Sequence, residues 1–131
     1  MRVLRTFAVI ALTMFPAAVG AESVFGIYQT LAGNNGGYAH VEIYPCEEKV
    51  CGVVRRAFAD SRQEIKDDPA LNVRIIWNMK PLGNGRYGGG KIYAVDRDQT
   101  FSATMTRKKE GLEVSGCLLL FCSSQLWKPV K

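Results

Sequence analysis

The sequence has little of what enzyme active sites are usually built from. It contains a single histidine, His40, which falls beside Glu42 on the polar face of an expected strand. A lone histidine next to a carboxylate can support acid–base chemistry only if a nucleophile lies nearby, and the sequence indicates none. The aspartates do not follow the spacing of a calcium loop. We therefore expect a protein that is not an enzyme and that holds no metal ion or cofactor.

The sequence also lacks a strong excess of charge of one sign. No run of lysines and arginines interleaved with aromatic residues is present, so a nucleic-acid partner is not expected. The longest basic cluster, Arg107-Lys108-Lys109, runs directly into Glu110-Gly111 and is typical of a solvated hairpin turn. The triple glycine Gly88-Gly89-Gly90 precedes Lys91 but lacks the pattern of a phosphate-binding loop. We interpret it as a bend or bulge in a strand.

Long hydrophobic runs are limited to the N-terminus. Arg2 and Arg5 are followed by the apolar run 7–15 and by the small residues Val19-Gly20-Ala21, which together predict a cleavable signal peptide over residues 1–21. The run is too short to span a bilayer. Removing its two arginines leaves 15 of the 17 basic residues against 12 acids, a net charge of +3. The expected mature chain, residues 22–131, fits one domain in the periplasm or outside the cell.

Four cysteines follow the leader as two pairs of identical spacing, Cys46/Cys51 and Cys117/Cys122. Sequence alone permits three pairings. Strand alternation places both thiols of each pair on one sheet face across a short turn, and this arrangement favours two local disulfides. The chain-entropy model gives each such short loop about 2 kcal/mol. The alternative, a four-cysteine zinc site, normally requires closer spacing and a reducing compartment.

Short alternating segments separated by glycine and asparagine clusters predict an all-β fold. The clusters are 33–37 and 83–85. Regular strand spacing with turn signals between is typical of an antiparallel sandwich or barrel, and eight strands in meander order would close into a small up-and-down barrel. Only the polar segment 57–72, with a possible helical turn, breaks the rhythm, and a connection of this length suggests a lid or a mobile loop. The expected strands are 24–30, 38–46, 50–56, 73–80, 87–95, 99–107, 112–118 and 122–130.

The inward-facing residues of such a barrel decide whether its interior is filled or hollow. Several of them are small, which either leaves room for a ligand or only permits the bends of a small barrel. If Trp127 faces inward, then Gln125 and Ser123 do too, and a polar pair beside a large aromatic suits a ligand pocket. The same pair could instead bind neighbouring backbone or a buried water. The inward set predicted from alternation is Ala39, Val41, Ile43, Val50, Gly52, Val54, Phe101, Ala103, Met105, Leu112, Val114 and Gly116.

Several motifs together resemble one bacterial family. They are Gly26-Ile27-Tyr28, the hairpin 46–52, Gly89 to Tyr93 with Asp96 and Phe101-Ser102-Ala103, and the closing block 116–127. The chain resembles the secreted family called domain of unknown function 2147 over essentially all of its mature length. The resemblance implies a lipocalin-like (calycin-type) barrel, export, and no established activity. The sequence departs from the family pattern at Tyr28, where Trp is usual, at Val95 and Gln99 around Asp96, and at the Trp127-Lys128 ending.

The sequence thus predicts a lipocalin-like barrel that binds a small, largely apolar ligand in its interior. Aromatic side chains would bury the ligand, and Gln125 would supply an orienting hydrogen bond. The alternative is an envelope interaction module, such as an inhibitor of a cell-wall hydrolase, that acts through its loops. The sequence indicates neither the ligand nor the oligomeric state. The candidate ligand-binding residues are Tyr28, Trp77, Phe101, Met105, Gln125 and Trp127.

One hairpin tip suggests a partner. Leu118-Leu119-Leu120-Phe121 would occupy the turn between Cys117 and Cys122, where polar residues are normal. Since soluble proteins seldom expose such groups, we expect the tip to fold back as a plug over one end of the barrel. The alternative is contact with a membrane surface or with another envelope protein.

Overall fold

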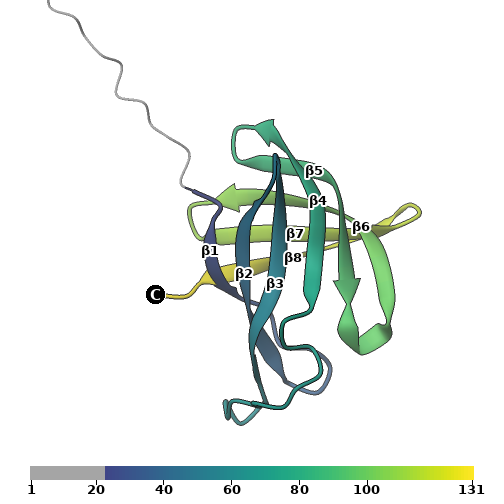
Figure 1. Cartoon of the computed structure of the whole chain (residues 1–131). Helices are drawn as coiled ribbons and strands as arrows, with labels where there is room; N and C mark the ends of the chain where they lie inside the picture. Colours follow the sequence, from purple (N-terminus) through teal and green to yellow (C-terminus); the bar gives the residue numbers. More distant parts are fainter. Residues whose placement is uncertain (1–22) are drawn as a thin grey trace, which may run out of the picture.

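The computed structural model describes residues 23–131, so the predicted signal peptide, residues 1–21, lies outside the described residues. Eight antiparallel strands follow one another around a closed barrel in sequence order, and β1 pairs with β8 to complete it (Figure 1). The prediction of an all-β up-and-down barrel is therefore confirmed. The strands are β1 (Gly26–Gln29), β2 (Tyr38–Cys46), β3 (Lys49–Phe58), β4 (Arg74–Gly83), β5 (Arg86–Ala94), β6 (Gln99–Lys108), β7 (Gly111–Leu118) and β8 (Phe121–Pro129).

Tight turns join most neighbouring strands. Asn84 and Gly85 connect β4 to β5 and both have positive φ, 57° and 72°, a backbone conformation that favours asparagine and glycine in two-residue hairpins. A single 3-10 turn, η1 (Val95–Arg97), connects β5 to β6. No helix within residues 23–131 has the length and apolar character needed to cross a membrane.

Irregularities in β4 and β5 explain why these strands do not alternate cleanly. The register of β4 on β3 shifts between Gly52 and Val53, so that Ile75 and Ile76 are both buried and Trp77 is only half-buried. The register of β5 on β6 shifts at the glycines that precede Lys91, as predicted. A Cβ atom on Gly90 would lie 2.5 Å from Met79 Sδ and 2.8 Å from the Trp77 carbonyl oxygen. Glycine here lets β4 and β5 approach closely.

The barrel interior is packed at one end. Alternation places large apolar side chains from most strands inward, and they are almost completely buried. The predicted inward faces of β2, β3, β6 and β7 are confirmed. The packed end is the one at which the β2–β3, β4–β5 and β6–β7 turns lie, and its most buried large side chains include Ile43, Ile76, Met79, Met105 and Leu112.

Both local disulfides are present. Cys46 bonds to Cys51 and Cys117 to Cys122, so all four cysteines are paired and none remains to bind zinc. The first bridge lies across the β2–β3 turn and the second across the β7–β8 turn, at opposite ends of the barrel. The bridges therefore clamp two hairpins.

The outer face of β3 is more buried than alternation predicts. Cys51 and Val53 face outward, yet they are 2% and 7% exposed. Val53 lies between Glu42 and Arg74 on the neighbouring strands. Arg55 donates hydrogen bonds to the Glu42 carboxylate and Arg74 donates to the Tyr44 hydroxyl. The stems of such long charged side chains cover neighbouring apolar surface, which explains the low exposure of Val53.

The long β3–β4 connection forms no helical turn within residues 59–73. It is held to β3 by backbone hydrogen bonds, because the Ile65 amide donates to the Ala57 carbonyl and the Asn72 amide donates to the Val54 carbonyl. Leu71 and Val73 pack against the core. The connection therefore forms an anchored wall beside the open end of the barrel, next to the β1–β2 loop (Figure 1).

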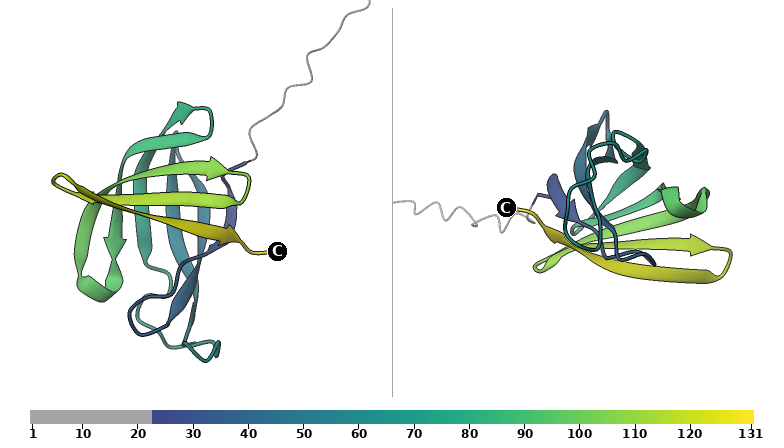
Figure 2. Two further views of the ribbon diagram at one scale, coloured as in Figure 1. Left: turned by 180° about the vertical axis from the view of Figure 1, so that it is seen from behind. Right: turned by 90° about the horizontal axis from the view of Figure 1, so that it is seen from below.

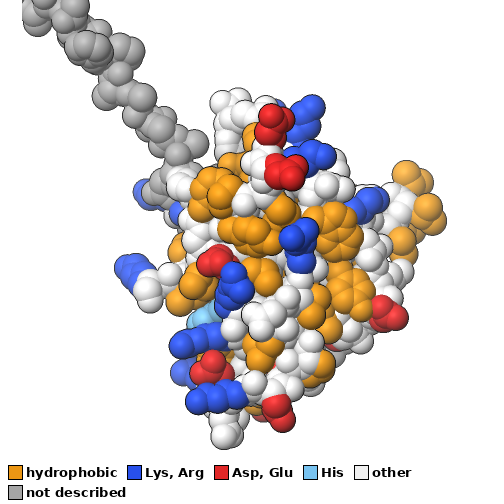
Figure 3. Space-filling view, in the orientation of Figure 1, with side chains coloured by type: hydrophobic (Ala, Val, Ile, Leu, Met, Phe, Trp, Pro, Cys, Tyr) orange, Lys and Arg blue, Asp and Glu red, His pale blue; other side chains and the backbone are white. Residues whose placement is uncertain are grey.

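The expectation that the β7–β8 tip folds back as a plug is wrong. The hairpin extends beyond the neighbouring strands (Figures 1 and 2). Leu119, Leu120 and Phe121 are 91%, 96% and 82% exposed. Figure 3 shows the resulting apolar protrusion at the right-hand edge of the molecule. Two cross-linked strands support the tip, so it stands clear of the barrel.

Candidate functional site

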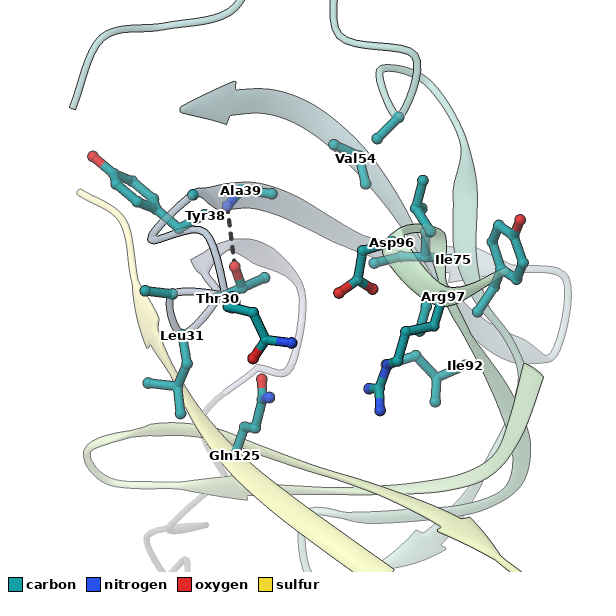
Figure 4. Close-up of a pocket in the computed structure, with 18 of the residues that line it drawn as sticks. Thr30, Leu31, Tyr38, Ala39, Val54, Ile75, Ile92, Asp96, Arg97 and Gln125 are labelled. Carbon is teal, nitrogen blue, oxygen red and sulfur yellow. Dashed lines mark hydrogen bonds between the residues drawn. The ribbon is translucent and has the colours of Figure 1, made fainter. Parts of the chain in front are cut away.

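The end of the barrel opposite the packed core contains a cavity of about 1040 Å³. It opens among four connections: the β1–β2 loop, the β3–β4 loop, the η1 turn and the β7–β8 tip. Its walls are mostly apolar, with Val54, Ile75, Ile92 and Val114 among them, and three of these side chains are labelled around the cavity in Figure 4. The volume is at the upper end of the range of ordinary small-molecule sites. The barrel is therefore filled at one end and hollow at the other.

Three of the six candidate residues line this cavity, namely Phe101, Gln125 and Trp127. Tyr28 and Met105 belong instead to the packed core. The Tyr28 hydroxyl donates a 2.8 Å hydrogen bond to the Val24 carbonyl. Trp77 lies on the outer wall opposite Lys91 and outside the cavity lining.

Gln125 belongs, with Ser123, to the polar pair that we expected beside Trp127 on β8, and it contacts the indole of Trp127 directly. The Trp127 indole nitrogen donates a 3.1 Å hydrogen bond to Gln125 Oε1. Because the indole N–H can only donate, it fixes which end of the Gln125 amide is oxygen. The amide points toward the cavity (Figure 4) and leaves its NH₂ group available to donate. Ser123, two residues earlier on β8, also lines the cavity.

The η1 turn adds two charged residues that we did not predict from the sequence. Asp96 and Arg97 line the cavity, and Figure 4 shows both side chains directed into it. The Arg97 guanidinium lies over the Phe101 ring, 5.3 Å from its centre, in a cation–π contact. The motif resemblance had pointed to Asp96 without a role. Arg97 lies in a loop whose path the strand pattern does not determine.

Tyr93 and Asp98 hold the η1 turn in place. Asp98 ends the turn with φ 45° and ψ 50°, and its carboxylate accepts a 2.6 Å hydrogen bond from the Tyr93 hydroxyl. This hydrogen bond, together with partial desolvation and the negative charge of Asp98, raises the pKa of Tyr93 above its ordinary value. The contact fixes the base of the turn from which Asp96 and Arg97 project.

His40 lies outside the cavity, on the outer face of β2. Its ring packs 4.6 Å from the ring of Phe58, which stacks on Tyr38. Desolvation, and secondarily the positive charge of Arg56, lowers the pKa of His40 below its ordinary value. This environment favours the neutral ring. Over residues 23–131, no three His, Cys, Asp or Glu side chains gather where they could hold a metal ion.

The fold defines the class of protein, a small lipocalin-like β-barrel with an interior cavity. The solved structure of protein HP1028 from the human pathogen Helicobacter pylori, which belongs to the lipocalin family, is similar over 83% of this chain and 84% of its own. The TM-score is 0.66 and the sequence identity 20%. At this identity the likeness concerns the fold alone.

The family is defined by sequence. The chain belongs to DUF2147, described as an uncharacterized protein conserved in bacteria, whose family model matches residues 26–129. The match covers all eight strands and confirms the resemblance found in the motifs. No curated protein shows significant similarity to the chain.

Proposed function

We propose that this protein is an exported, non-enzymatic carrier that binds a small, largely apolar ligand in the open half of its barrel. The observation that carries the proposal is the cavity of about 1040 Å³, whose lining is more apolar than polar, as is usual for a small-molecule site. Two disulfides suit an oxidising compartment outside the cytoplasm. Phe101 and Trp127 would bury the ligand, and the Gln125 NH₂ group would orient it.

Trp127 provides a direct test, since the protein has only two tryptophans and Trp77 lies on the outer wall. In a Trp77→Phe variant, Trp127 is the sole indole, and its fluorescence reports on the cavity. We expect the neutral apolar dye N-phenyl-1-naphthylamine to quench Trp127 by energy transfer and to gain fluorescence itself, with saturation at one dye per chain.

A filled cavity should abolish this binding. Gly116 lines the cavity, and a Cβ atom there would make ordinary contacts with Ile92 and Phe101 at 3.4–3.5 Å, so Gly116→Phe would place a ring inside. Ser115→Phe is the matched control, because Ser115 faces outward and its hydroxyl bonds to that of Ser124. Uptake of dye by Gly116→Phe equal to that of Ser115→Phe would refute the carrier proposal.

A second candidate function is contact with a membrane, into whose apolar interior Leu118, Leu119, Leu120 and Phe121 would insert. The exposure of these residues at a protruding tip favours it. Four residues on a convex hairpin are far fewer than the roughly 20–30 residues that each partner contributes to a stable protein interface. A small apolar tip of this shape is better suited to insertion into lipid. The broader alternative of a hydrolase inhibitor that acts through its loops stays a prediction.

Sedimentation with phosphatidylcholine vesicles tests this contact. Leu119→Gln combined with Leu120→Gln should release the protein from the vesicles. Leu82→Gln, a change at a leucine that is 55% exposed on β4, should not. Equal sedimentation of both variants would exclude a role for the tip in lipid contact.

A further inference from the structure

Two adjacent residues of opposite charge face the cavity from one turn. Asp96 and Arg97 occupy η1, and Figure 4 shows the carboxylate and the guanidinium both directed into the open space, toward the side on which Gln125 lies. The remaining lining is mainly apolar, with Asp60 and Asp68 of the β3–β4 connection as its other charged residues. Asp96 and Arg97 are exposed at the mouth of the cavity, where a purely apolar ligand would use neither charge.

The two side chains do not neutralise each other. Within residues 23–131 the side-chain ion pairs join Arg55 to Glu42, Arg56 to Glu64 and Lys108 to Glu113, and neither η1 residue takes part. Over the same residues the Arg97 side chain takes part in no hydrogen bond or ion pair, and its guanidinium lies over the Phe101 ring. Both charges are therefore available to a ligand.

The turn that carries them is fixed in position. The Asp98 carboxylate accepts a hydrogen bond from Tyr93 at the base of η1, and the Phe101 ring supports the Arg97 guanidinium from below. A preorganised pair of opposite charges discriminates between ligands, because a head group of a single sign leaves one partner partly desolvated and uncompensated.

We propose that the ligand is a zwitterionic amphiphile with an anionic phosphate and a cationic amine, as in an ethanolamine-type lysophospholipid. The phosphate would pair with Arg97 and accept from the Gln125 NH₂ group, and the ammonium would pair with Asp96. The acyl chain would lie against Val54, Ile75, Ile92 and Val114. This inference rests on the proposed function, since it assigns the head-group end of the same cavity.

The test compares three lipids that carry the same acyl chain and differ only in head group: lysophosphatidylethanolamine, lysophosphatidylglycerol and a monoacylglycerol. Binding is followed by Trp127 fluorescence in the Trp77→Phe background, below the concentration at which the lipids form micelles. We expect the ethanolamine lipid to bind about tenfold more tightly than the glycerol lipid, the scale of one charge-assisted hydrogen bond. The monoacylglycerol should bind most weakly.

Two variants should change this selectivity in different ways. Asp96→Asn should lower the affinity for the ethanolamine lipid by about tenfold. It should raise the affinity for the anionic glycerol lipid, because a negative charge is removed. Arg97→Gln should lower the affinity for both phospholipids and leave the affinity for the monoacylglycerol unchanged. Asp67→Asn is the matched control: it removes one negative charge from the β3–β4 connection beside the same cavity mouth, at an exposed position outside the cavity lining.

The outcomes separate this inference from the carrier proposal. Equal affinity for all three lipids, or the same shift for Asp67→Asn as for Asp96→Asn, would overturn the head-group inference and leave the carrier function standing. If neither the lipids nor the naphthylamine dye perturb Trp127, both proposals fail.

Discussion

The two halves of the barrel interior are built from the same strands with the same alternation, yet one is packed and the other is hollow. On β6, Met105 is buried in the core whereas Phe101, four residues earlier on the same face, lines the cavity. On β8, Trp127 marks the boundary, and Gln125 and Ser123 continue into the open half. The comparison shows that alternation determines on which face of the sheet a side chain lies. Its position along the barrel axis then determines whether it packs in the core or lines the cavity.

The largest difference between the halves should appear in stability. Leu112 is completely buried in the packed half, and Leu112→Ala should lower the free energy of unfolding by about 3 kcal/mol, since it leaves a cavity among fixed neighbours. Phe101→Ala in the hollow half should cost less than about 1 kcal/mol, because one side of the ring already faces open space. Urea unfolding measures both, and equal losses would show that the halves are packed alike.

The two disulfides should contribute similarly in spite of their different surroundings. Each closes a loop of the same length, so replacing either pair with serines should lower the free energy of unfolding by about 2 kcal/mol in the chain-entropy model. Urea unfolding of the two double variants under identical conditions measures the losses. A loss confined to the Cys46–Cys51 bridge at the packed end would show that packing around the bridge, and not loop closure, sets its contribution.

Replacement of glycine by alanine should also affect stability differently in the two halves. Gly90→Ala at the packed end should cost about 1.5 kcal/mol, because the added methyl group would overlap Met79 and the backbone of Trp77. Gly116→Ala in the hollow half meets its neighbours only at ordinary contact distance and should be nearly neutral. Thermal unfolding monitored by circular dichroism measures both, and a destabilised Gly116→Ala would contradict the open character of that half.

The smallest effect concerns the η1 turn of the hollow half. The Asp98 contact raises the pKa of Tyr93, so Asp98→Asn should shift its ultraviolet titration toward lower pH. Because the folded-state pKa is the higher one, the hydrogen bond contributes stability below the ordinary tyrosine pKa near 10 and loses it as pH rises through the folded-state value. An unchanged Tyr93 titration would mean that this contact does not hold the turn.

Local patterns predicted much of this structure because the interactions they report are local. The pattern 38–46 predicted the bounds of β2, and the cluster 83–85 predicted the turn between β4 and β5. The two Cys-x4-Cys pairs gave the disulfides, since thiols that share a face across a short turn lie within bonding distance. The bulge at Ile75 and Ile76 escaped prediction because it depends on the register against β3.

The candidate site was predicted only in part for the same reason. Phe101, Gln125 and Trp127 were found from their inward faces, but Tyr28 and Met105 share that orientation and lie at the packed end. Asp96 and Arg97 were missed because η1 lies between strands, where no periodicity indicates where a side chain points. The β7–β8 tip was misjudged because its composition does not reveal how far the hairpin extends.

The sequence by itself determined the strands, their order, the paired cysteines and the face on which most strand residues lie, because turn chemistry and alternation act over a few residues. Only the tertiary structure decided which end of the barrel is filled, that the leucine-rich tip stands free, and that Asp96 and Arg97 meet the cavity. These features depend on the closure of the barrel and on where its loops fall, which bring together residues that are far apart in the chain.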